Sequence, residues 1–186
     1  MVNSGRDMAV FVQFASISKR FGGTTALDNV SFSIQEGEIH AVIGENGAGK
    51  STLMGILSGV LPKDSGRIFV AGREIVFRTV VDAQREGIST VYQEPHLVPH
   101  MTVAENIFLG REPTGRLGFV DFTTLNARAR EILAQLELTI SPTTQLAGLG
   151  PAEVQLVQIA RAIAFSTKIL VLDEPTASIT EHETKI

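Results

Sequence analysis

The feature that most constrains the fold is a glycine-rich run that begins at Gly44. Residues 44–51 read Gly-Glu-Asn-Gly-Ala-Gly-Lys-Ser and fit the pattern G-x-x-x-x-G-K-[ST]. A short apolar run, Ile39–Ile43, precedes it, and apolar residues at helical spacing follow it from Leu53. The sequence therefore predicts a buried strand, a phosphate-binding loop and a helix that ends near Gly59, in that order.

The residue types of this loop suit the binding of a nucleoside triphosphate, and ATP is the expected ligand. Glycines let the backbone wrap closely around a phosphate, and the following helix directs its positive end at the same anion. We expect Lys50 to reach the β- and γ-phosphates and the Ser51 hydroxyl to hold Mg²⁺. The residues expected to bind the nucleotide are Gly44, Glu45, Asn46, Gly47, Ala48, Gly49, Lys50, Ser51 and Thr52.

A second candidate motif follows the wholly apolar run Ile169–Leu172, which predicts a strand buried on both faces. Asp173 and Glu174 come directly after it. We expect Asp173 to bind Mg²⁺ and Glu174 to orient or deprotonate the attacking water. An Asp-Glu pair alone is often an ordinary strand end, and the glycine-rich loop is what favours the functional interpretation. Both motifs would lie at the carboxyl edge of one parallel sheet, where ligands of such sheets bind.

The remaining elements are predicted from alternation, helical spacing and turn residues. A turn at Gly22-Gly23 separates two alternating runs, and short strands up to Ile75 predict a small antiparallel patch. Pro151 opens a further helix. The pattern as a whole predicts an α/β fold with a mostly parallel sheet, a small antiparallel β patch and a helical subdomain over about residues 94–165. The other expected elements are strands at Val10–Ile17, Val30–Ile34 and Gly87–Tyr92 and a helix at about Thr124–Leu138.

Composition narrows the function classes. The formal net charge of −4 argues weakly against nucleic acid as a bulk partner. The chain has no cysteine, which excludes disulfides and thiolate metal sites. No run reaches the ~18 apolar residues of a membrane span, and the polar start of the chain does not fit a signal peptide. We expect residues 1–9 to be disordered and any membrane role to need separate subunits.

Together these residues resemble the nucleotide-binding subunit of an ATP-binding cassette (ABC) transporter, over about Val12–Glu183. The resemblance implies a P-loop NTPase (RecA-like) fold in a single domain over residues 10–186. It also implies that Gln93 contacts Mg²⁺ and water and senses a membrane subunit, and that Phe21 stacks on adenine. For Phe21 an ordinary core aromatic is the alternative. The stretch Val91–Pro113 is similar to monosaccharide importers of the ribose, galactose and arabinose type.

This branch implies ATP hydrolysis coupled to sugar import. The implied partners are membrane-spanning permease subunits, a second cassette in the same longer chain or in a dimer, and indirectly a sugar-binding protein, with no nucleic acid. Gln93 and the stretch Val98–Gly110 would form the docking surface. The implied location is peripheral, at the cytoplasmic face of the membrane.

Two departures from the family pattern bear on activity. Residues 149–153 read Leu-Gly-Pro-Ala-Glu where the family signature is Leu-Ser-Gly-Gly-Gln. The missing serine removes a charge-assisted bond of about 1.5–3 kcal/mol, and Glu153 adds a negative charge beside an anion. We therefore expect a weak signature, typical of the first of two unequal cassettes. The chain also stops at Ile186, before the strand that would carry the family's switch histidine, so we expect it to be truncated at its C-terminus.

Two alternatives stay open. One is a truncated nucleotide-binding remnant without independent ATPase activity. The other is a non-transport ABC ATPase of DNA repair or translation. The repair type carries long coiled coils between its two phosphate motifs, and the translation type is usually a tandem chain with a charged linker. Neither feature is present in this sequence.

Overall fold

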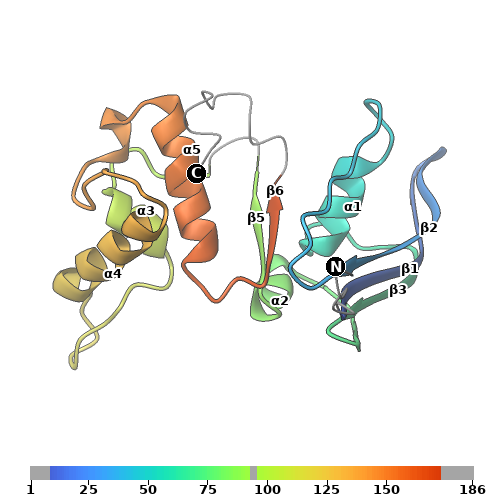
Figure 1. The fold of residues 1–186 in the computed structure, drawn as a ribbon, viewed down its shortest axis with the longest axis horizontal. Helices are drawn as coiled ribbons and strands as arrows, with labels where there is room; N and C mark the ends of the chain where they lie inside the picture. Colours follow the sequence, from blue (N-terminus) through green and yellow to red (C-terminus); the bar gives the residue numbers. More distant parts are fainter. Residues whose placement is uncertain (1–8, 93–95, 173–186) are drawn as a thin grey trace, which may run out of the picture. The chain divides into compact units, whose positions relative to one another are not determined.

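The computed structural model describes residues 9–92 and 96–172. The chain divides into two compact units, Met1–Glu86 and Gly87–Ile186. In Figure 1 the colours run from blue to green through the first unit and from green to red through the second. The phosphate-loop sequence belongs to the first unit, and the strand that precedes Asp173 belongs to the second.

The first unit contains an antiparallel sheet in the order β2-β1-β3-β4. Its core includes Phe14 and Ile17, whereas Phe11 is only partly buried. Ser16 has φ 55°, and the pairing with β2 shifts register between Phe14 and Ile17. This bulge brings two residues three positions apart to buried positions, which strict alternation would prevent. The strands are β1 (Val10–Phe21), β2 (Thr24–Gln35), β3 (Ser65–Val70) and β4 (Arg73–Ile75).

Helix α1 (Lys50–Leu57) lies beside this sheet (Figure 1) and buries Leu53, Ile56 and Leu57. The helix ends as the sequence predicts: Gly59 has φ 74°, and the amides of the next two residues donate to the Gly55 carbonyl oxygen. A shorter helix, α2 (Val80–Arg85), follows β4 and begins with a capping box.

The predicted buried strand Ile39–Ile43 is the main local error. These residues belong to neither sheet among the described residues, and the side chains of Ile39 and Ile43 are 100% and 90% exposed. A strand needs a neighbour whose backbone completes its hydrogen-bond ladder, and no described strand pairs with this segment. The apolar run is therefore an exposed connection between β2 and the phosphate loop.

The second unit contains the predicted parallel pair. Strands β5 (Ile88–Val91) and β6 (Ile169–Leu172) pair in register from Ile88 with Ile169 to Val91 with Leu172. With the antiparallel sheet of the first unit, this pair confirms the mixed α/β class. Burial of β6 on both faces is wrong for the described structure, because Val171 is buried while Leu170 and Leu172 are exposed. Among the described residues β6 has a single neighbour, β5.

A helical cluster lies between β5 and β6 in sequence. Its helices are α3 (Val103–Phe108), α4 (Phe122–Gln135) and α5 (Pro151–Ile163), with a short 3-10 helix at Leu146–Gly148. Proline occupies the first helical position of α5, as the sequence predicts. Asp121 caps α4, so that helix begins two residues before the predicted Thr124. In the part of the chain that the structure describes, no helix is long and apolar enough to cross a membrane. The residues that form the centre of the cluster are Val103, Ile107, Leu125, Leu133, Leu146 and Val157.

Candidate nucleotide-binding site

The glycine-rich loop has the backbone that its sequence requires at two positions. Gly47 and Gly49 have φ of +86° and +87°, a region that L-residues rarely adopt. A Cβ added to Gly49 would lie 2.3 Å from the carbonyl oxygen of Ala26, whereas a Cβ at Gly47 would meet nothing within 4 Å. Gly49 therefore lets the loop pass against β2, and Gly47 keeps the outer side of the loop free of a side chain.

The start of α1 has the properties of an anion site. Gly49 is its N-cap, no side chain caps the helix, and its first turn has no acidic residue. The Leu53 amide donates to the Gly49 carbonyl oxygen at 2.9 Å, so the amides of residues 50–52 have no acceptor within the helix. Uncapped amides and the helix dipole together attract a phosphate.

The Lys50 side chain folds back over the loop. Its Nζ donates to the carbonyl oxygens of Gly44 at 2.8 Å and Glu45 at 2.9 Å. A cation at the positive end of a helix is electrostatically unfavourable without an anion nearby, and these two carbonyl oxygens provide negative partial charge. The ammonium group is therefore held against the backbone of the loop.

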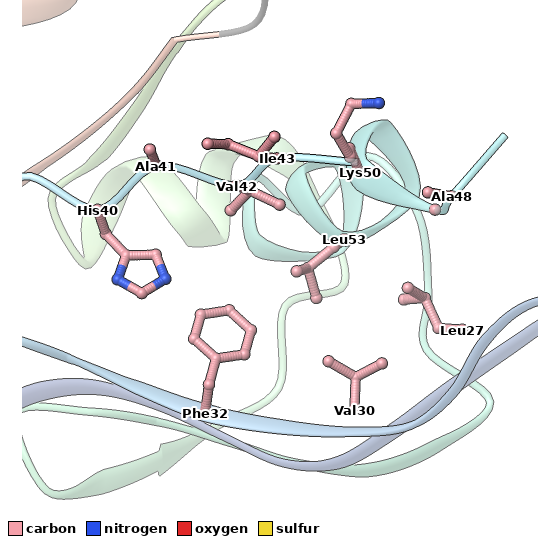
Figure 2. A pocket seen from close by; sticks show the side chains of 11 residues that line it. Leu27, Val30, Phe32, His40, Ala41, Val42, Ile43, Ala48, Lys50 and Leu53 are labelled. Atoms are coloured by element: carbon pink, nitrogen blue, oxygen red, sulfur yellow. The ribbon is translucent and has the colours of Figure 1, made fainter. Parts of the chain in front are cut away.

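A pocket of about 320 Å³ is lined by residues of β2, of the segment 40–43, of the phosphate loop and of α1. Figure 2 shows Phe32, Val30 and Leu53 facing into it, while the Lys50 ammonium points away. Most of the lining is apolar, and His40 and Lys50 are the lining residues with polar side chains. The loop residues Ala48, Gly49 and Lys50 thus line this pocket as well.

Phe21, the expected adenine-stacking residue, is the last residue of β1 and is 47% exposed. The Lys19 Nζ lies 5.4 Å from its ring centroid and 2.7 Å from Asp64 Oδ1. The Arg20 amide donates to Asp64 Oδ2 at 2.7 Å. These bonds, first from Lys19 and then from Arg20, lower the pKa of the Asp64 carboxyl. Asp64 thus fixes the end of β1, where the Phe21 ring is exposed.

Sequence reasoning did not find the roles of Lys19 and Asp64. The two residues are 45 positions apart, and each is unremarkable in its own surroundings: Lys19 in a strand and Asp64 in a turn. An acidic residue in a Pro-Lys-Asp-Ser-Gly turn has an ordinary explanation as a turn former. The pairing becomes visible only when β1 and the turn before β3 are placed side by side.

Three of the expected catalytic and metal-binding residues, Gln93, Asp173 and Glu174, lie outside the described residues. The strands that precede them in sequence are parallel neighbours and end at a matched pair, Val91 and Leu172. Within residues 9–92 and 96–172 no three His, Asp or Glu side chains form a group that could hold a metal ion. Of the expected Mg²⁺ ligands, only Ser51 lies in the described part of the chain.

Residues 149–153, the segment expected to be a weak signature, contain the start of α5. Gly150 is the N-cap, and the Glu153 carboxylate accepts a hydrogen bond from the Gly150 amide at 2.9 Å. An internal carboxylate therefore already uses the amide that opens this helix. This arrangement agrees with the expectation that the segment is a poor partner for a phosphate.

A wrapped glycine loop, an uncapped helix start and a lysine at its mouth, in a mixed α/β fold, define a P-loop nucleotide-binding protein. The family profile described as "ABC transporter" matches residues 27–177, and the chain belongs to that family. This confirms the resemblance and the fold class expected from the sequence.

Curated relatives carry sugar-import names. The chain is 50% identical over 177 residues to the ribose import ATP-binding protein RbsA of Rhodopirellula baltica, covering 95% of the chain and 35% of that protein. It is 47% identical over 173 residues to a putative ribose/galactose/methyl galactoside import ATP-binding protein of Burkholderia ambifaria. That match covers 93% of the chain and 33% of the relative. The chain thus spans about a third of the length of these relatives.

Solved structures agree on the fold. A nucleotide-free ATP-binding cassette from an ABC transporter superposes with a TM-score of 0.80 at 29% identity, over 95% of the chain and 73% of that structure. The ADP conformation of another cassette gives a TM-score of 0.82 at 29% identity, with the same coverage. The likeness extends over nearly the whole chain.

Proposed function

We propose that this chain binds ATP on the loop Gly44–Thr52 and contributes one ATP-hydrolysing cassette to a sugar importer. The observation that carries the proposal is the start of α1, where no side chain caps the helix and the Lys50 ammonium is held by the carbonyl oxygens of the loop itself. Lys50 would exchange its two carbonyl partners for phosphate oxygens, and Phe21 would stack on the adenine. Ser51, Gln93 and Asp173 are the proposed Mg²⁺ ligands.

In the proposed reaction, water attacks the γ-phosphorus and the bond to the bridging oxygen breaks, which releases ADP and phosphate. Glu174 orients the water and accepts its proton, and the loop amides and Lys50 stabilise the charge on the phosphate oxygens. When bound, Mg²⁺ would neutralise part of the negative charge on the phosphate oxygens. Gln93, which follows β5, is proposed to sense the membrane-spanning subunits at the cytoplasmic face.

The names of the relatives support monosaccharide import as the coupled process. Permease subunits are the proposed partners, with a sugar-binding protein acting through them, and a second cassette would complete the ATP site. The bond between Glu153 and the Gly150 amide supports a role as the cassette with the weak signature. Its own loop would then work with the signature of the second cassette.

ATP binding is the first test. We expect Lys50→Ala to weaken the affinity for a fluorescent ATP analogue by about 100-fold, because two charge-assisted bonds are lost. Lys63→Ala is a matched control, since Lys63 Nζ also bonds a nearby backbone carbonyl oxygen, that of Gly66 in β3 at 2.6 Å. Equal affinities in the wild type and Lys50→Ala would contradict the proposal.

Turnover is the second test. Mixing the chain with a cassette that has an intact Leu-Ser-Gly-Gly-Gln signature should produce ATPase activity. Glu174→Gln in this chain should abolish that activity and leave ATP binding in place. Activity that survives Glu174→Gln would show that the hydrolysed ATP is not on this loop. Sugar uptake by the assembled importer should be lost with the same variant.

A further inference from the structure

Lys19 places a buried positive charge near the end of β1. It is 8% exposed, and it is the one charged residue among the buried residues that the structure describes. A lysine is seldom buried without a partner, because its ammonium group loses water that must be replaced. Lys19 Nζ lies 2.7 Å from Asp64 Oδ1 and 5.4 Å from the ring centroid of Phe21. The ammonium group is therefore shared between a carboxylate and an aromatic ring.

Asp64 holds this lysine against a fixed stretch of backbone. Its second oxygen, Oδ2, accepts a hydrogen bond from the Arg20 amide at 2.7 Å. Its own amide donates to the Ser18 carbonyl oxygen at 3.0 Å, and β3 begins directly after it. Asp64 is thus bonded to all three residues that immediately precede Phe21. It therefore determines where the Lys19 ammonium lies relative to the ring.

The ring of Phe21 has the cation on one side and is open to solvent elsewhere. Phe21 is 47% exposed, whereas the side chain of the lysine that lies over its ring is only 10% exposed. The faces of aromatic rings carry negative potential, so two stacked rings repel each other there. A cation over the ring is attracted to this negative potential and compensates part of it. The ring of Phe21 is therefore better suited to stack on an electron-rich ring, such as a purine, than an isolated phenylalanine is.

We propose that Lys19 and Asp64 are positioning residues for the nucleotide base: Asp64 holds the ammonium group over Phe21, and Lys19 sets the orientation and the charge distribution of the ring that stacks on adenine. This inference rests on the proposed binding of ATP with its base against Phe21. Stacking involves the base and not the phosphates. The pair should therefore affect the affinity for ATP and leave unchanged the affinity for inorganic tripolyphosphate, which has no base.

Calorimetric titrations with ATP and with tripolyphosphate test this selectivity. We expect Lys19→Met to weaken ATP binding by about two- to fivefold, the effect of one cation–ring contact, with no change for tripolyphosphate. Lys19→Arg should keep most of the ATP affinity, since a guanidinium also pairs with a carboxylate and lies over rings. Arg67→Met is the matched control, because Arg67 Cζ lies 5.6 Å from the ring centroid of Phe69 in the same sheet. Equal losses for both ligands, or an equal loss of ATP affinity in Arg67→Met, would overturn the proposal.

A double-mutant cycle shows whether the lysine acts through the ring. In a Phe21→Ala background, Lys19→Met should cause no further loss of ATP affinity; a loss that persists there would contradict the proposal. Asp64→Asn is a milder variant, since its side chain is 44% exposed and asparagine can still accept the bond from the Arg20 amide. It should weaken ATP binding by a smaller factor and leave tripolyphosphate binding unchanged. An unchanged ratio of the two affinities would refute the role of Asp64.

Nuclear magnetic resonance measures the contact between Lys19 and Phe21 without any nucleotide. An aromatic ring shifts protons over its face upfield, so the Lys19 Hε resonances should return toward their usual position in Phe21→Leu and move part of the way in Asp64→Asn. Unchanged Lys19 resonances in Phe21→Leu would overturn the inference. A wild type that binds neither ATP nor tripolyphosphate would refute the proposed function itself. A wild type that binds both, with ATP affinity unchanged in Lys19→Met, would refute this inference alone.

Discussion

Replacing Gly49 by alanine tests the claim that the phosphate loop depends on a close approach to β2. The new Cβ would lie 2.3 Å from the Ala26 carbonyl oxygen and 2.9 Å from Leu27 Cδ2, at a φ of +87°. The left-handed backbone costs an alanine about 1–2 kcal/mol, and relieving the overlap costs a further ~1–3 kcal/mol. Reduced entropy of the unfolded chain offsets about 0.4–1 kcal/mol. We expect the free energy of unfolding to fall by about 2–4 kcal/mol.

Gly47→Ala is the matched control because it has the same backbone strain without the collision. Gly47 has φ +86°, and a Cβ there would meet nothing within 4 Å. The backbone strain lowers the free energy of unfolding, and the reduced entropy of the unfolded chain offsets part of this effect. The net loss is about 0.5–1 kcal/mol. Since the outer side of the loop would face the phosphates, Gly47→Ala should nevertheless weaken ATP binding. The two variants therefore separate stability from binding.

Urea denaturation followed by circular dichroism measures the free energy of unfolding of both variants. Titration with a fluorescent ATP analogue measures their affinity for ATP. Thermal melting provides a check, since each kcal/mol shifts the Tm of a chain of this size by about 2–4 °C. If Gly49→Ala is no less stable than Gly47→Ala, the approach of the loop to the Ala26 carbonyl oxygen is not tight. The structural reasoning would then be refuted.

Three further predictions follow from side chains outside the loop. Asn106→Leu removes the bonds of a fully buried amide to Val98, Met101 and Thr102, so urea denaturation should show a loss of about 2–4 kcal/mol. Asp64→Asn should lower stability at neutral pH. Because the pKa of Asp64 is lowered from 3.8, its contribution is present above that value and is lost as pH falls through the folded-state pKa. The Tm difference between wild type and Asp64→Asn should therefore shrink between about pH 5 and pH 3; a constant difference would contradict this. Phe21→Ala should weaken ATP binding by about tenfold with little change in Tm, and Phe21→Tyr should preserve it; equal losses would contradict stacking.

Elements with strong local signals were predictable from the sequence. The hairpin of β1 and β2 has alternating residues around a Gly-Gly turn, the Gly59 end of α1 has a glycine at positive φ, and Pro151 opens α5. In each case the interactions that determine the local structure are between residues only a few positions apart in sequence. The class of the fold followed from these elements and from the phosphate-loop pattern.

What the sequence did not predict depends on neighbours that are distant along the chain. An apolar run such as Ile39–Ile43 reads as a buried strand, but its burial depends on which strands complete its ladder. The hydrogen bond from Gln158 Nε2 to the Tyr92 carbonyl oxygen spans 66 positions, and the one from Lys19 Nζ to Asp64 Oδ1 spans 45. No local pattern marks either pair. The roles of Gln93, Asp173 and Glu174 stay predictions from the sequence.

The hydrogen bonds of Lys50 to Gly44 and Glu45 bear on how nucleotide leaves the site. These two carbonyl oxygens compete with a bound phosphate for the Lys50 ammonium group. Binding then exchanges one set of charge-assisted bonds for another, so its net free energy is smaller than the new contacts alone imply. When ADP and phosphate dissociate, the ammonium recovers its loop partners at once. Such an exchange favours rapid release over tight retention, which would suit the repeated turnover that the proposed function requires.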